Sequence, residues 1–472
     1  MAKIKITSIK KTTAVATLNM QFDSDNPAFK YATELINNKE PLIYLTGKAG
    51  TGKTTFLKHL KETTKKNLIV VAPTGVAAIN AGGVTINSFF QIPFGPFLPE
   101  DARLRTMAVE REDDATIFST FLYGQERKNI INKMELLIID EVSMVRADTV
   151  DVIDKILRAF RGKPDLPFGG VQVIFIGDAF QLPPIANKEE WPILKEFYKS
   201  PFFFSSMVIV NNTPKYVELK KIYRQNDQTF IDLLNRVRIN ETSKADIDLL
   251  NTKLNPNFSG NGGDYITLAT HNKIVSETNT TKLKELKTQI FAFEAKTDGV
   301  FPDKHKPTDD TLLLKVGAQV MFVKNNAIKK YFNGKIGKVK TIKGKNIIVQ
   351  CDNGEEFWVE QDTWENIKYV YNKKKKTVEK EVVGTFTQFP LRLAWAITVH
   401  KSQGLTFEKV IADLQRAFAP GQVYVALSRC TSLDGLILKS HLFSSAIKTD
   451  PHVIEFAKNE ARITLKDRQV QA

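Results

Sequence analysis

The chain has 472 residues, more than one hydrophobic core normally spans, and its length predicts about three domains. It is 42% hydrophobic and 25% charged, with 31 phenylalanines, which excludes a disordered or fibrous protein. Lysine and arginine number 67 against 52 acidic residues, and the resulting net charge of +15 favours a polyanionic partner such as nucleic acid.

The number of cysteines and the length of the apolar runs indicate the cellular compartment in which the protein acts. The two cysteines, Cys351 and Cys430, are too few for a disulfide framework or a zinc module. The N-terminal segment is basic but has no sustained apolar core, and no apolar run reaches the roughly 20 residues of a membrane helix. We therefore expect a cytoplasmic, nucleoid-associated protein that acts without a membrane.

Short, continuous apolar runs recur in the first half of the chain, as is typical of parallel strands buried on both faces. The runs are LIYL (42–45), LIVVA (68–72), LLII (136–139) and VQVIFI (171–176). Helix-competent segments follow at 53–61 and 148–161. This alternation predicts a first α/β domain with a parallel sheet in residues 1–90 and 134–200, interrupted by a Pro- and Phe-rich insertion at 91–133.

A second α/β domain is expected in residues 201–288 and 389–445. Its predicted strands are MVIV (207–210), YVEL (216–219), ITLAT (266–270), KVIADL (409–414) and GLILK (435–439), and its predicted helices are 227–239, 273–287 and 422–430. Between 289 and 388, short strands separated by Asn-Gly, Lys-Gly and Asp-Asn-Gly turns predict an inserted antiparallel β module. Residues 446–472 are a C-terminal extension.

The clearest chemical motif lies directly after the LIYLT strand. Residues 47–54, GKAGTGKT, match the pattern G-x-x-x-x-G-K-[ST] and open a helix. The glycines let backbone N–H groups surround phosphates, and the helix N-terminus favours the negative charge. Lys53 is expected to reach the β and γ phosphates, and the Thr54 hydroxyl to ligate Mg²⁺. The predicted nucleotide-binding residues of this loop are Gly47, Ala49, Gly50, Thr51, Gly52, Lys53, Thr54 and Thr55.

Two further motifs follow buried runs. Asp140 and Glu141 end the LLII strand, which would place one carboxylate beside a metal and its neighbour where it can activate a water. Gln181 follows VQVIFI within GDAFQLPP and is suited to sensing the γ-phosphate, although a structural glutamine would explain it equally well. Together with the phosphate loop, these residues predict a Mg²⁺-dependent nucleoside triphosphatase.

Two arginines of the second predicted α/β domain lie near element ends. Arg224 in IYRQ and Arg429 in SRC could each reach across a cleft to the γ-phosphate, and such an arginine is worth about 10³ to 10⁵ in rate. For either residue alone, a surface ion pair is the alternative explanation.

Candidate nucleic-acid contacts occur in both domains. The candidate contacts are Pro73, Thr74, Gly75, Asn87 and Ser88 in the first domain and Thr398, His400 and Lys401 in the second. Hydroxyl, amide and basic side chains of such segments can bind the phosphates of a nucleic acid without recognising its bases. The rings of Phe89, Phe90, Phe94 and Phe97 could stack on bases of a single strand, although core packing is the favoured role for any one of them.

Taken in chain order, the motifs form a recognisable series: TGKAGTGKTTFL, APTGVAAINAGGVTINSFF, IIDEVSMVRAD, GDAFQLPP, IYRQ, ITVHKSQGLTFEKV and YVALSRC. The series resembles helicase superfamily one and, within it, the Pif (petite integration frequency) family of 5′-to-3′ DNA helicases, over about residues 26 to 440. The resemblance implies two RecA-like domains that bind ATP between them. It also implies a duplex-splitting wedge at 91–133 and a small barrel similar to Src-homology-three domains at 289–388.

The resemblance also implies roles for individual residues. Lys53 and Thr54 would be the phosphate-loop pair, Asp140 the Mg²⁺ ligand and Glu141 the catalytic base. Gln181 would sense the γ-phosphate, Arg224 and Arg429 would be arginine fingers, and Gly404 would lie at the nucleotide. The implied single-strand contacts are Thr74, Ser88, Thr398, His400 and Lys401.

The chain departs from the family pattern at two positions. Lys30 stands where the family has a glutamine that reads adenine, which leaves Asn26 or Gln21 as substitutes. Asn87 stands where relatives have a histidine before the serine, so a hydrogen-bonding group is kept and a stacking ring is lost. We expect a modest effect on DNA affinity.

The sequence therefore predicts an ATP- and Mg²⁺-dependent helicase that moves 5′ to 3′ on single-stranded DNA and acts at single-strand/duplex junctions as a monomer. A RecD-like or RNA-directed helicase would share the ATP site. A DNA-binding ATPase that clamps or remodels without separating strands is the alternative of a different class.

Overall fold

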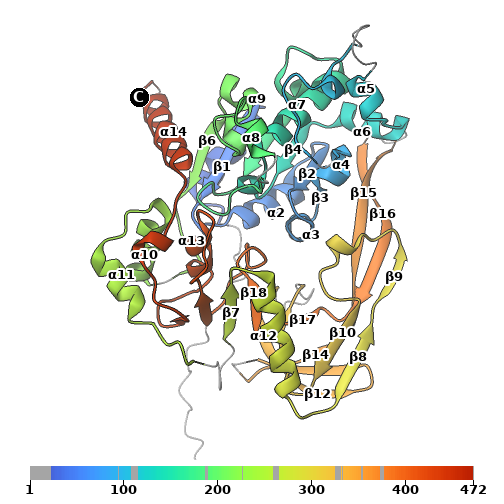
Figure 1. Cartoon of the computed structure of the whole chain (residues 1–472). Coiled ribbons are helices and arrows are strands. Elements are labelled where there is room, and N and C mark those ends of the chain that lie inside the picture. The colour runs from blue at the N-terminus through green and yellow to red at the C-terminus, as the bar shows by residue number, and fades with distance from the viewer. Residues whose placement is uncertain are drawn as a thin grey trace, which may run out of the picture.

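A computed structural model describes residues 23–93, 95–107, 115–186, 190–225, 227–258, 265–324, 331, 333–351, 354–372 and 377–470. Gln21 and Phe94, for which a role was predicted, lie outside these residues. The chain forms two α/β units, and an antiparallel β module extends from the second (Figure 1).

The first unit is built on a six-stranded parallel sheet with the order β3-β2-β4-β5-β1-β6. Its strands are β1 (Leu42–Gly47), β2 (Leu68–Ala72), β3 (Val84–Thr85), β4 (Leu136–Ile139), β5 (Gln172–Ile176) and β6 (Lys215–Leu219). The four apolar runs predicted as strands from the first part of the chain are thus confirmed. β1, β4 and β5 are buried along their whole length because helices cover both faces of the sheet.

Alternate residues of each strand enter two separate cores. Tyr44, Val71 and Phe175 belong to one hydrophobic cluster, whereas Leu45 and Ile174 belong to the other. The covering helices are α1 (Pro27–Asn37), α2 (Lys53–Thr63), α3 (Gly75–Ala81), α4 (Ile86–Phe90), α5 (Ile117–Thr120), α6 (Gln125–Lys133), α7 (Ala147–Arg161), α8 (Trp191–Leu194) and α9 (Met207–Asn211), with 3₁₀ turns η1 (Ala102–Leu104), η2 (Val142–Met144), η3 (Pro167–Gly170) and η4 (Phe203–Ser205). This is the doubly wound arrangement predicted from the sequence.

Two expectations for residues 201–219 are wrong. β6 pairs in parallel with β1, with Tyr216 opposite Tyr44, so the first unit continues to Leu219 rather than ending at residue 200. The MVIV run is helix α9 and not a strand. The buried carboxylate of Asp151 accepts the N–H groups of Met207 at 2.9 Å and Val208 at 3.0 Å, which satisfies the first turn of that helix.

The insertion at residues 91–133 is anchored in the first unit. It contains η1, α5 and α6, and the side chains of Phe97, Leu104, Ile117 and Ile130 are buried in the same core as Tyr44. The segment therefore contributes to the stability of the first unit.

The second unit has a four-stranded parallel sheet with the order β18-β7-β19-β20. Its elements are β7 (Ile266–Ala269), β18 (Ala396–Thr398), β19 (Val410–Asp413) and β20 (Leu436–Leu438), with α10 (Gln228–Ile239), α11 (Lys244–Asn251), α12 (Asn272–Glu285) and α13 (Gln422–Leu427). The three predicted strands of this sheet are confirmed, and β18 was not predicted.

The inserted module is antiparallel, as the turns predicted. It contains a five-stranded sheet (β14-β13-β12-β11-β17), a ribbon (β10-β8) and a three-stranded sheet (β15-β16-β9). The elements are β8 (Ile290–Glu294), β9 (Lys296–Gly299), η5 (Asp303–His305), β10 (Thr311–Lys315), β11 (Gln319–Phe322), β12 (Ile336–Lys343), β13 (Asn346–Gln350), β14 (Glu356–Val359), β15 (Asp362–Asn372), β16 (Thr377–Gln388) and β17 (Leu391–Leu393). Among the described residues no strand pairing joins these sheets into one, so a closed barrel remains a prediction. The long β15–β16 hairpin reaches α6 of the first unit (Figure 1).

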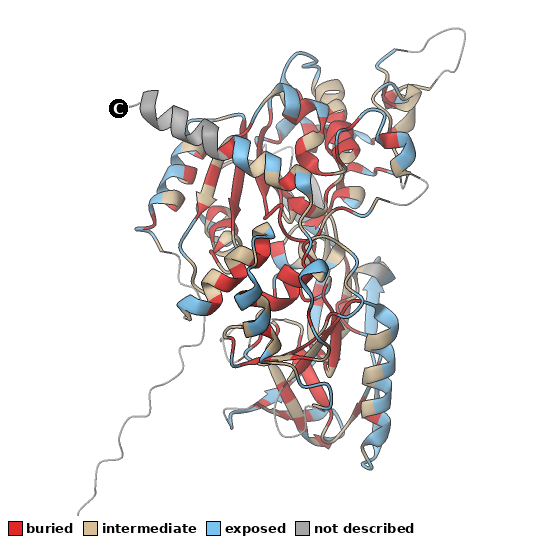
Figure 2. Cartoon of the chain, turned by 60° about the vertical axis from the view of Figure 1, so that its left-hand side comes forward, coloured by how far each residue is buried: buried red, intermediate tan, exposed pale blue. Residues whose placement is uncertain are grey.

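The C-terminal segment returns to the first unit through η6 (Ser444–Ala446) and helix α14 (Pro451–Val470). The ring of Phe456 stacks on Phe204 with centroids 4.2 Å apart, and Lys199 forms an ion pair with Glu455 at 2.8 Å. Figure 2 shows buried residues concentrated in the two parallel sheets, with exposed residues on the outward faces of the helices. In the part of the chain that the structure describes, no helix has the length and apolarity needed to cross a membrane.

Candidate active site between the two units

The candidate residues of the first unit gather at one edge of its sheet. Residues 48–54 follow β1, Asp140 follows β4, and Asp178 follows β5. β5 lies between β1 and β4, so the carboxyl ends of three neighbouring parallel strands carry the phosphate loop, the acidic pair and the turn that holds Gln181. Such an edge is where open α/β sheets bind ligands.

The phosphate loop has the backbone geometry that its glycines allow. Gly50 has φ +79°, and a Cβ there would lie 2.4 Å from the Cβ of Arg224, so another residue would clash. The Lys53 amine, at the start of α2, donates to the carbonyl oxygens of Gly47 at 2.5 Å and Lys48 at 3.0 Å. Burial lowers the pKa of Lys53 to about 8, opposed by the charges of Asp178 and Glu141. The amine therefore remains mostly protonated at neutral pH.

The other loop residues differ in exposure. Thr54 is exposed and Thr55 half-buried, whereas Thr51 is buried and its hydroxyl donates to the Lys48 carbonyl at 2.9 Å. Ala49 is buried within the hydrophobic cluster of the second unit. The loop thus has one side open for phosphate and the other side packed against the neighbouring unit.

The acidic pair is held in a constrained turn. Asp140 is fixed by its N–H, which donates to the Val71 carbonyl at 2.9 Å, and Glu141 adopts left-handed angles, φ 50° and ψ 44°. Such a conformation is strained for a residue with a Cβ and is typical of functional sites. Burial raises the pKa of both carboxyls, and the Glu141 charge raises that of Asp140 further.

A divalent cation suits this donor set. In the described part of the chain no group of three or more His, Cys, Asp or Glu side chains could hold a metal ion. Mg²⁺ in nucleotide sites typically uses one or two protein oxygens and completes its shell with phosphate and water. Thr54 and Asp140 would supply two such oxygens. A cation beside Asp140 would also relieve the repulsion between the carboxylates of Asp140 and Glu141.

Gln403 reaches the acidic pair from the second unit. Its amide nitrogen donates to Glu141 Oε2 at 2.9 Å and to Gln181 Oε1 at 3.2 Å. The structure therefore joins a proposed base and a proposed phosphate sensor through one side chain. No role at the ATP site was predicted for Gln403, and the available signal was the HKSQG motif that contains it.

Arg224 lies against the phosphate loop. The preceding Tyr223 donates its N–H to the Gly50 carbonyl at 2.9 Å, and Arg224 itself donates to the Ser428 carbonyl at 3.2 Å. Burial lowers the pKa of Arg224, and the charge of Arg429 lowers it further. The segment thus links the loop to α13.

Arg429 is buried, with 1% of its surface exposed. Its guanidinium donates to the carbonyls of Val425 at 3.0 Å and Leu405 at 3.3 Å and to the Ser428 hydroxyl at 2.9 Å. A surface ion pair is therefore the wrong explanation for this residue. The Glu141 charge still acts on its pKa, which burial lowers.

The candidate DNA contacts of the first unit lie at the starts of two short helices. The Thr74 hydroxyl caps α3 by accepting the Ala77 N–H at 3.2 Å, Pro73 is half-buried, and Asn87 donates its amide to the Ile92 carbonyl at 3.0 Å. Ser88 is exposed. Gly75 and Ser88 line a small cavity whose other wall is formed by η5 and β15 of the module.

Phe89 was named as a candidate DNA contact, and the structure places its ring in the core instead. Its ring is 1% exposed and belongs to the first-unit core, as do Phe90 and Phe97. The guanidinium of Arg127 covers the ring at 5.1 Å from its centroid. Helix α4 turns this side chain toward the sheet, so core packing is the correct explanation.

The candidate contacts of the second unit follow β18. Thr398 is 5% exposed, and its hydroxyl accepts the Lys401 N–H at 3.3 Å, so it stabilises the turn. Lys401 is exposed and His400 is half-buried, and burial lowers the pKa of His400 below its ordinary value. Gly404, with φ +79°, is exposed beside Gln403.

Asn26 is already engaged at the start of α1. Its side-chain oxygen accepts the Ala28 N–H at 3.0 Å, and its amide nitrogen donates to the Tyr223 hydroxyl at 3.1 Å. To read adenine, Asn26 would have to exchange one of these partners. Its role at the base remains a prediction.

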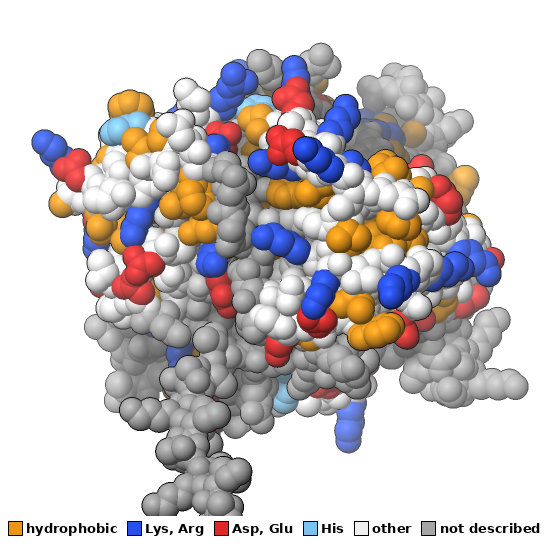
Figure 3. Space-filling model, turned by 90° about the horizontal axis from the view of Figure 1, so that it is seen from below, with side chains coloured by type: hydrophobic (Ala, Val, Ile, Leu, Met, Phe, Trp, Pro, Cys, Tyr) orange, Lys and Arg blue, Asp and Glu red, His pale blue; other side chains and the backbone are white. Residues whose placement is uncertain are grey.

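The charge on the underside of the molecule is mixed. Figure 3 shows basic, acidic and hydrophobic side chains interspersed on this face. The net positive charge of the chain is therefore not gathered into one patch there.

Comparison with known proteins gives concordant results. Residues 23–247 match the model of the family described as PIF1-like helicase. The chain is 30% identical to the ATP-dependent DNA helicase Pif1 of Bdellovibrio bacteriovorus over 447 residues, covering 92% of this chain and 91% of that protein. It is 33% identical to the human ATP-dependent DNA helicase PIF1 over 433 residues, which are 88% of this chain and 60% of the human protein. The chain thus spans about 60% of the length of that relative.

Solved structures agree with the sequence matches. The crystal structure of Bacteroides sp. Pif1 in complex with ADP-AlF4 has a TM-score of 0.84 and 41% identity, covering 92% of this chain and 97% of that one. Bacteroides Pif1 bound to single-stranded DNA has a TM-score of 0.64 at 42% identity, covering 92% and 96%. By TM-score, the fold of this chain is more similar to the complex with ADP-AlF4 than to the complex with single-stranded DNA.

Proposed function

The chain belongs to the PIF1-like helicase family, and from this membership and the site geometry we propose that it is an ATP-dependent DNA helicase that moves 5′ to 3′ on single-stranded DNA. One observation supports the proposal most directly: Gln403 of the second unit bonds both Glu141 and Gln181 of the first. A nucleotide bound at the loop would therefore meet groups from both units. Its hydrolysis would change how the units are held together.

In the proposed reaction Lys53 binds the β and γ phosphates, and the N–H groups at the start of α2 hold their negative charge. Mg²⁺ held by Thr54 and Asp140 would neutralise charge on the phosphates. Glu141 orients the attacking water and accepts its proton, and Gln403 fixes the carboxylate for that task. Arg224 and Arg429 stabilise the charge that develops on the γ-phosphate.

We propose that the single strand lies across both units, over Thr74 and Ser88 on the first and His400 and Lys401 on the second. These groups bind the backbone, so sequence preference should be weak. Each base-pair step opposes separation by about 1.4 kcal/mol of stacking, a small barrier compared with one ATP turnover. Bacteroides Pif1 is a relative solved with single-stranded DNA, which favours DNA over RNA as the track. Action at junctions and a monomeric state belong to the same proposal.

The test is ATP hydrolysis by the full chain with oligothymidylate, oligouridylate or no nucleic acid. The proposal requires strong stimulation by the DNA strand, with no turnover by Lys53→Ala. Stronger stimulation by RNA would favour an RNA-directed helicase. Stimulation by DNA without any strand separation would favour a clamp or remodelling ATPase.

A further inference from the structure

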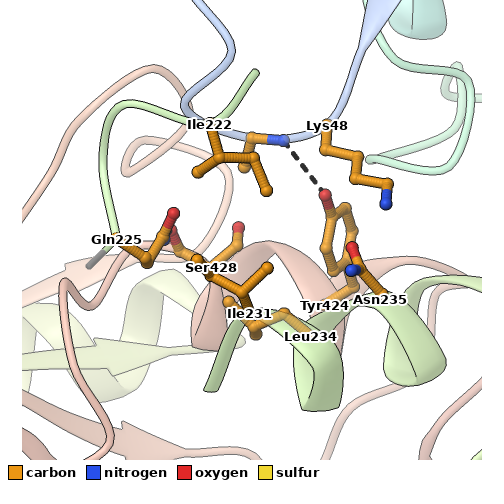
Figure 4. A pocket seen from close by; sticks show the side chains of 9 residues that line it. Lys48, Ile222, Gln225, Ile231, Leu234, Asn235, Tyr424 and Ser428 are labelled. Atoms are coloured by element: carbon orange, nitrogen blue, oxygen red, sulfur yellow. Dashed lines mark hydrogen bonds between the residues drawn. The ribbon is translucent and has the colours of Figure 1, made fainter. Parts of the chain in front are cut away.

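A small cavity separates the phosphate loop from the second unit (Figure 4). Lys48 and Ala49 of the loop line one side, and Leu234 and Asn235 of α10 and Tyr424 of α13 line the other. The Tyr424 hydroxyl points at the loop and accepts the Ala49 N–H at 3.1 Å. A side chain of the second unit thus holds the backbone of the phosphate loop.

The same hydroxyl also contacts the first unit at Asp178. Tyr424 Oη donates to Asp178 Oδ2 at 3.5 Å. Burial, with the Asp178 charge, raises the pKa of Tyr424 to about 12, so the phenol keeps its proton at neutral pH. It can therefore accept from Ala49 and donate to Asp178 at once.

Asp178 has a second partner from the second unit. The guanidinium of Arg238, on α10, bonds its two oxygens at 2.8 and 3.3 Å and stacks 3.9 Å from the centroid of the Phe180 ring. Asp178 is fully buried and Arg238 is 9% exposed. Burial alone would raise the pKa of Asp178, but the Arg238 charge and hydrogen bonds hold it below the ordinary value.

Asp178 lies in the same turn as the proposed phosphate sensor, Gln181. The Asp178 carbonyl accepts the N–H of Gln181 at 2.9 Å, so the carboxylate and the proposed phosphate sensor share one tight turn. That turn follows β5, between the strands that carry the phosphate loop and the acidic pair. A shift of Gln181 on γ-phosphate binding would therefore be transmitted to α10 and α13 through buried, charge-assisted contacts.

A contribution to the stability of the fold is, by itself, a weak explanation for the buried ion pair between Asp178 and Arg238. A buried ion pair is costly to desolvate, and apolar residues of similar volume often stabilise a contact as well or better. Its place at the junction of two units, beside the phosphate loop, favours a role in their coupling.

We propose that Tyr424 and Arg238 are positioning residues that couple the nucleotide state of the phosphate loop and the Gln181 turn to the placement of the second unit, and hence to DNA affinity. The proposal rests on the proposed function, because it requires both ATP and DNA sites. It assigns a role to two residues outside the phosphate-contacting set.

The experiment measures the Kd of fluorescent oligothymidylate with and without ADP-aluminium fluoride, for the full chain and for Tyr424→Phe, Arg238→Lys and Arg238→Ala. Coupled sites in proteins typically change each other's affinity about 5- to 150-fold. We expect the wild-type ratio to fall by about threefold or more in Tyr424→Phe and in both Arg238 variants, with Arg238→Lys the milder because it keeps the charge. The reciprocal ratio, nucleotide affinity with and without DNA, should change equally.

The control is Tyr198→Phe, which removes a buried hydroxyl that bonds Asp151 within the first unit. It should keep the wild-type ratio. A wild-type ratio near one, an unchanged ratio in Tyr424→Phe, or an equal loss in Tyr198→Phe would overturn the coupling role. Failure of the proposed function is a separate outcome, because the wild type would then bind no DNA or hydrolyse no ATP.

Discussion

Gln403 donates its amide N–H to the Glu141 carboxylate at 2.9 Å, although the two residues lie 262 positions apart and in different units. The contact places a group of the second unit on the side chain proposed to activate water. Closure between the units would therefore complete the site, because it brings the Gln403 amide onto the Glu141 carboxylate.

Gln403→Ala should lower kcat for DNA-stimulated ATP hydrolysis by about 10- to 100-fold with little change in KM, because a misplaced base affects the transition state more than binding. Gln403→Glu should be worse, since it adds a negative charge beside Glu141. Steady-state kinetics checks this, with Gln228→Ala as control, a residue that bonds Asp232 on the surface of α10. Equal kcat in Gln403→Ala and the control would exclude the role.

The two arginines should respond differently to truncation. Arg224→Ala should reduce ATP turnover by about 10³-fold at nearly unchanged Tm, since the side chain makes one hydrogen bond to the Ser428 carbonyl. Arg429→Ala should lower both turnover and Tm, because it removes three buried hydrogen bonds. Kinetics and thermal melting of both variants separate the effects. Normal turnover in Arg224→Ala would refute its assignment as a finger.

DNA binding should depend steeply on salt and little on pH. Lys401→Ala should lower the slope of log K against log salt by about 0.7, the value for one contact on a single strand, and the exposed Lys195→Ala should not. Burial holds the pKa of His400 below its ordinary value, so the charge of its ring appears only as the pH falls through that lowered pKa. Affinity should therefore be flat from about pH 7 to 8. A steady weakening over that window would contradict a neutral His400.

The proposed wedge must be tested by point substitution, because deleting residues 91–133 would remove Phe97 and Ile117 from the core. Met107 and Leu122 are each 80% exposed and are candidates to meet the duplex. Met107→Ser with Leu122→Ser should reduce strand separation by about tenfold or more and spare DNA-stimulated ATPase, if apolar contact with the fork separates the pairs. Parallel loss of both activities would speak against a dedicated wedge.

The sequence predicted the site where a motif follows a buried strand. Lys53, Asp140 and Gln181 each lie just beyond the end of an apolar run, and parallel pairing brings those ends together. The sheet itself was predictable for the same reason, because β1, β2, β4 and β5 are continuous apolar runs.

Residues that act between the units were not predictable from local pattern. Arg238 is one of several charged residues on an ordinary amphipathic helix, and only the fold places it on Asp178. The MVIV run is too short for its apolar character to distinguish strand from helix, and Asp151 decides the outcome. Phe89 was misassigned because its sequence does not reveal which face of a five-residue helix meets the sheet.

The proposed activity and polarity are tested most directly by strand separation, with ATP and Mg²⁺, of two matched duplexes that carry either a 5′ or a 3′ single-stranded DNA tail. The wild type should separate the 5′-tailed duplex alone, and Lys53→Ala should separate neither duplex. Efficient separation of the 3′-tailed duplex, or activity that survives loss of Lys53, would contradict the proposal.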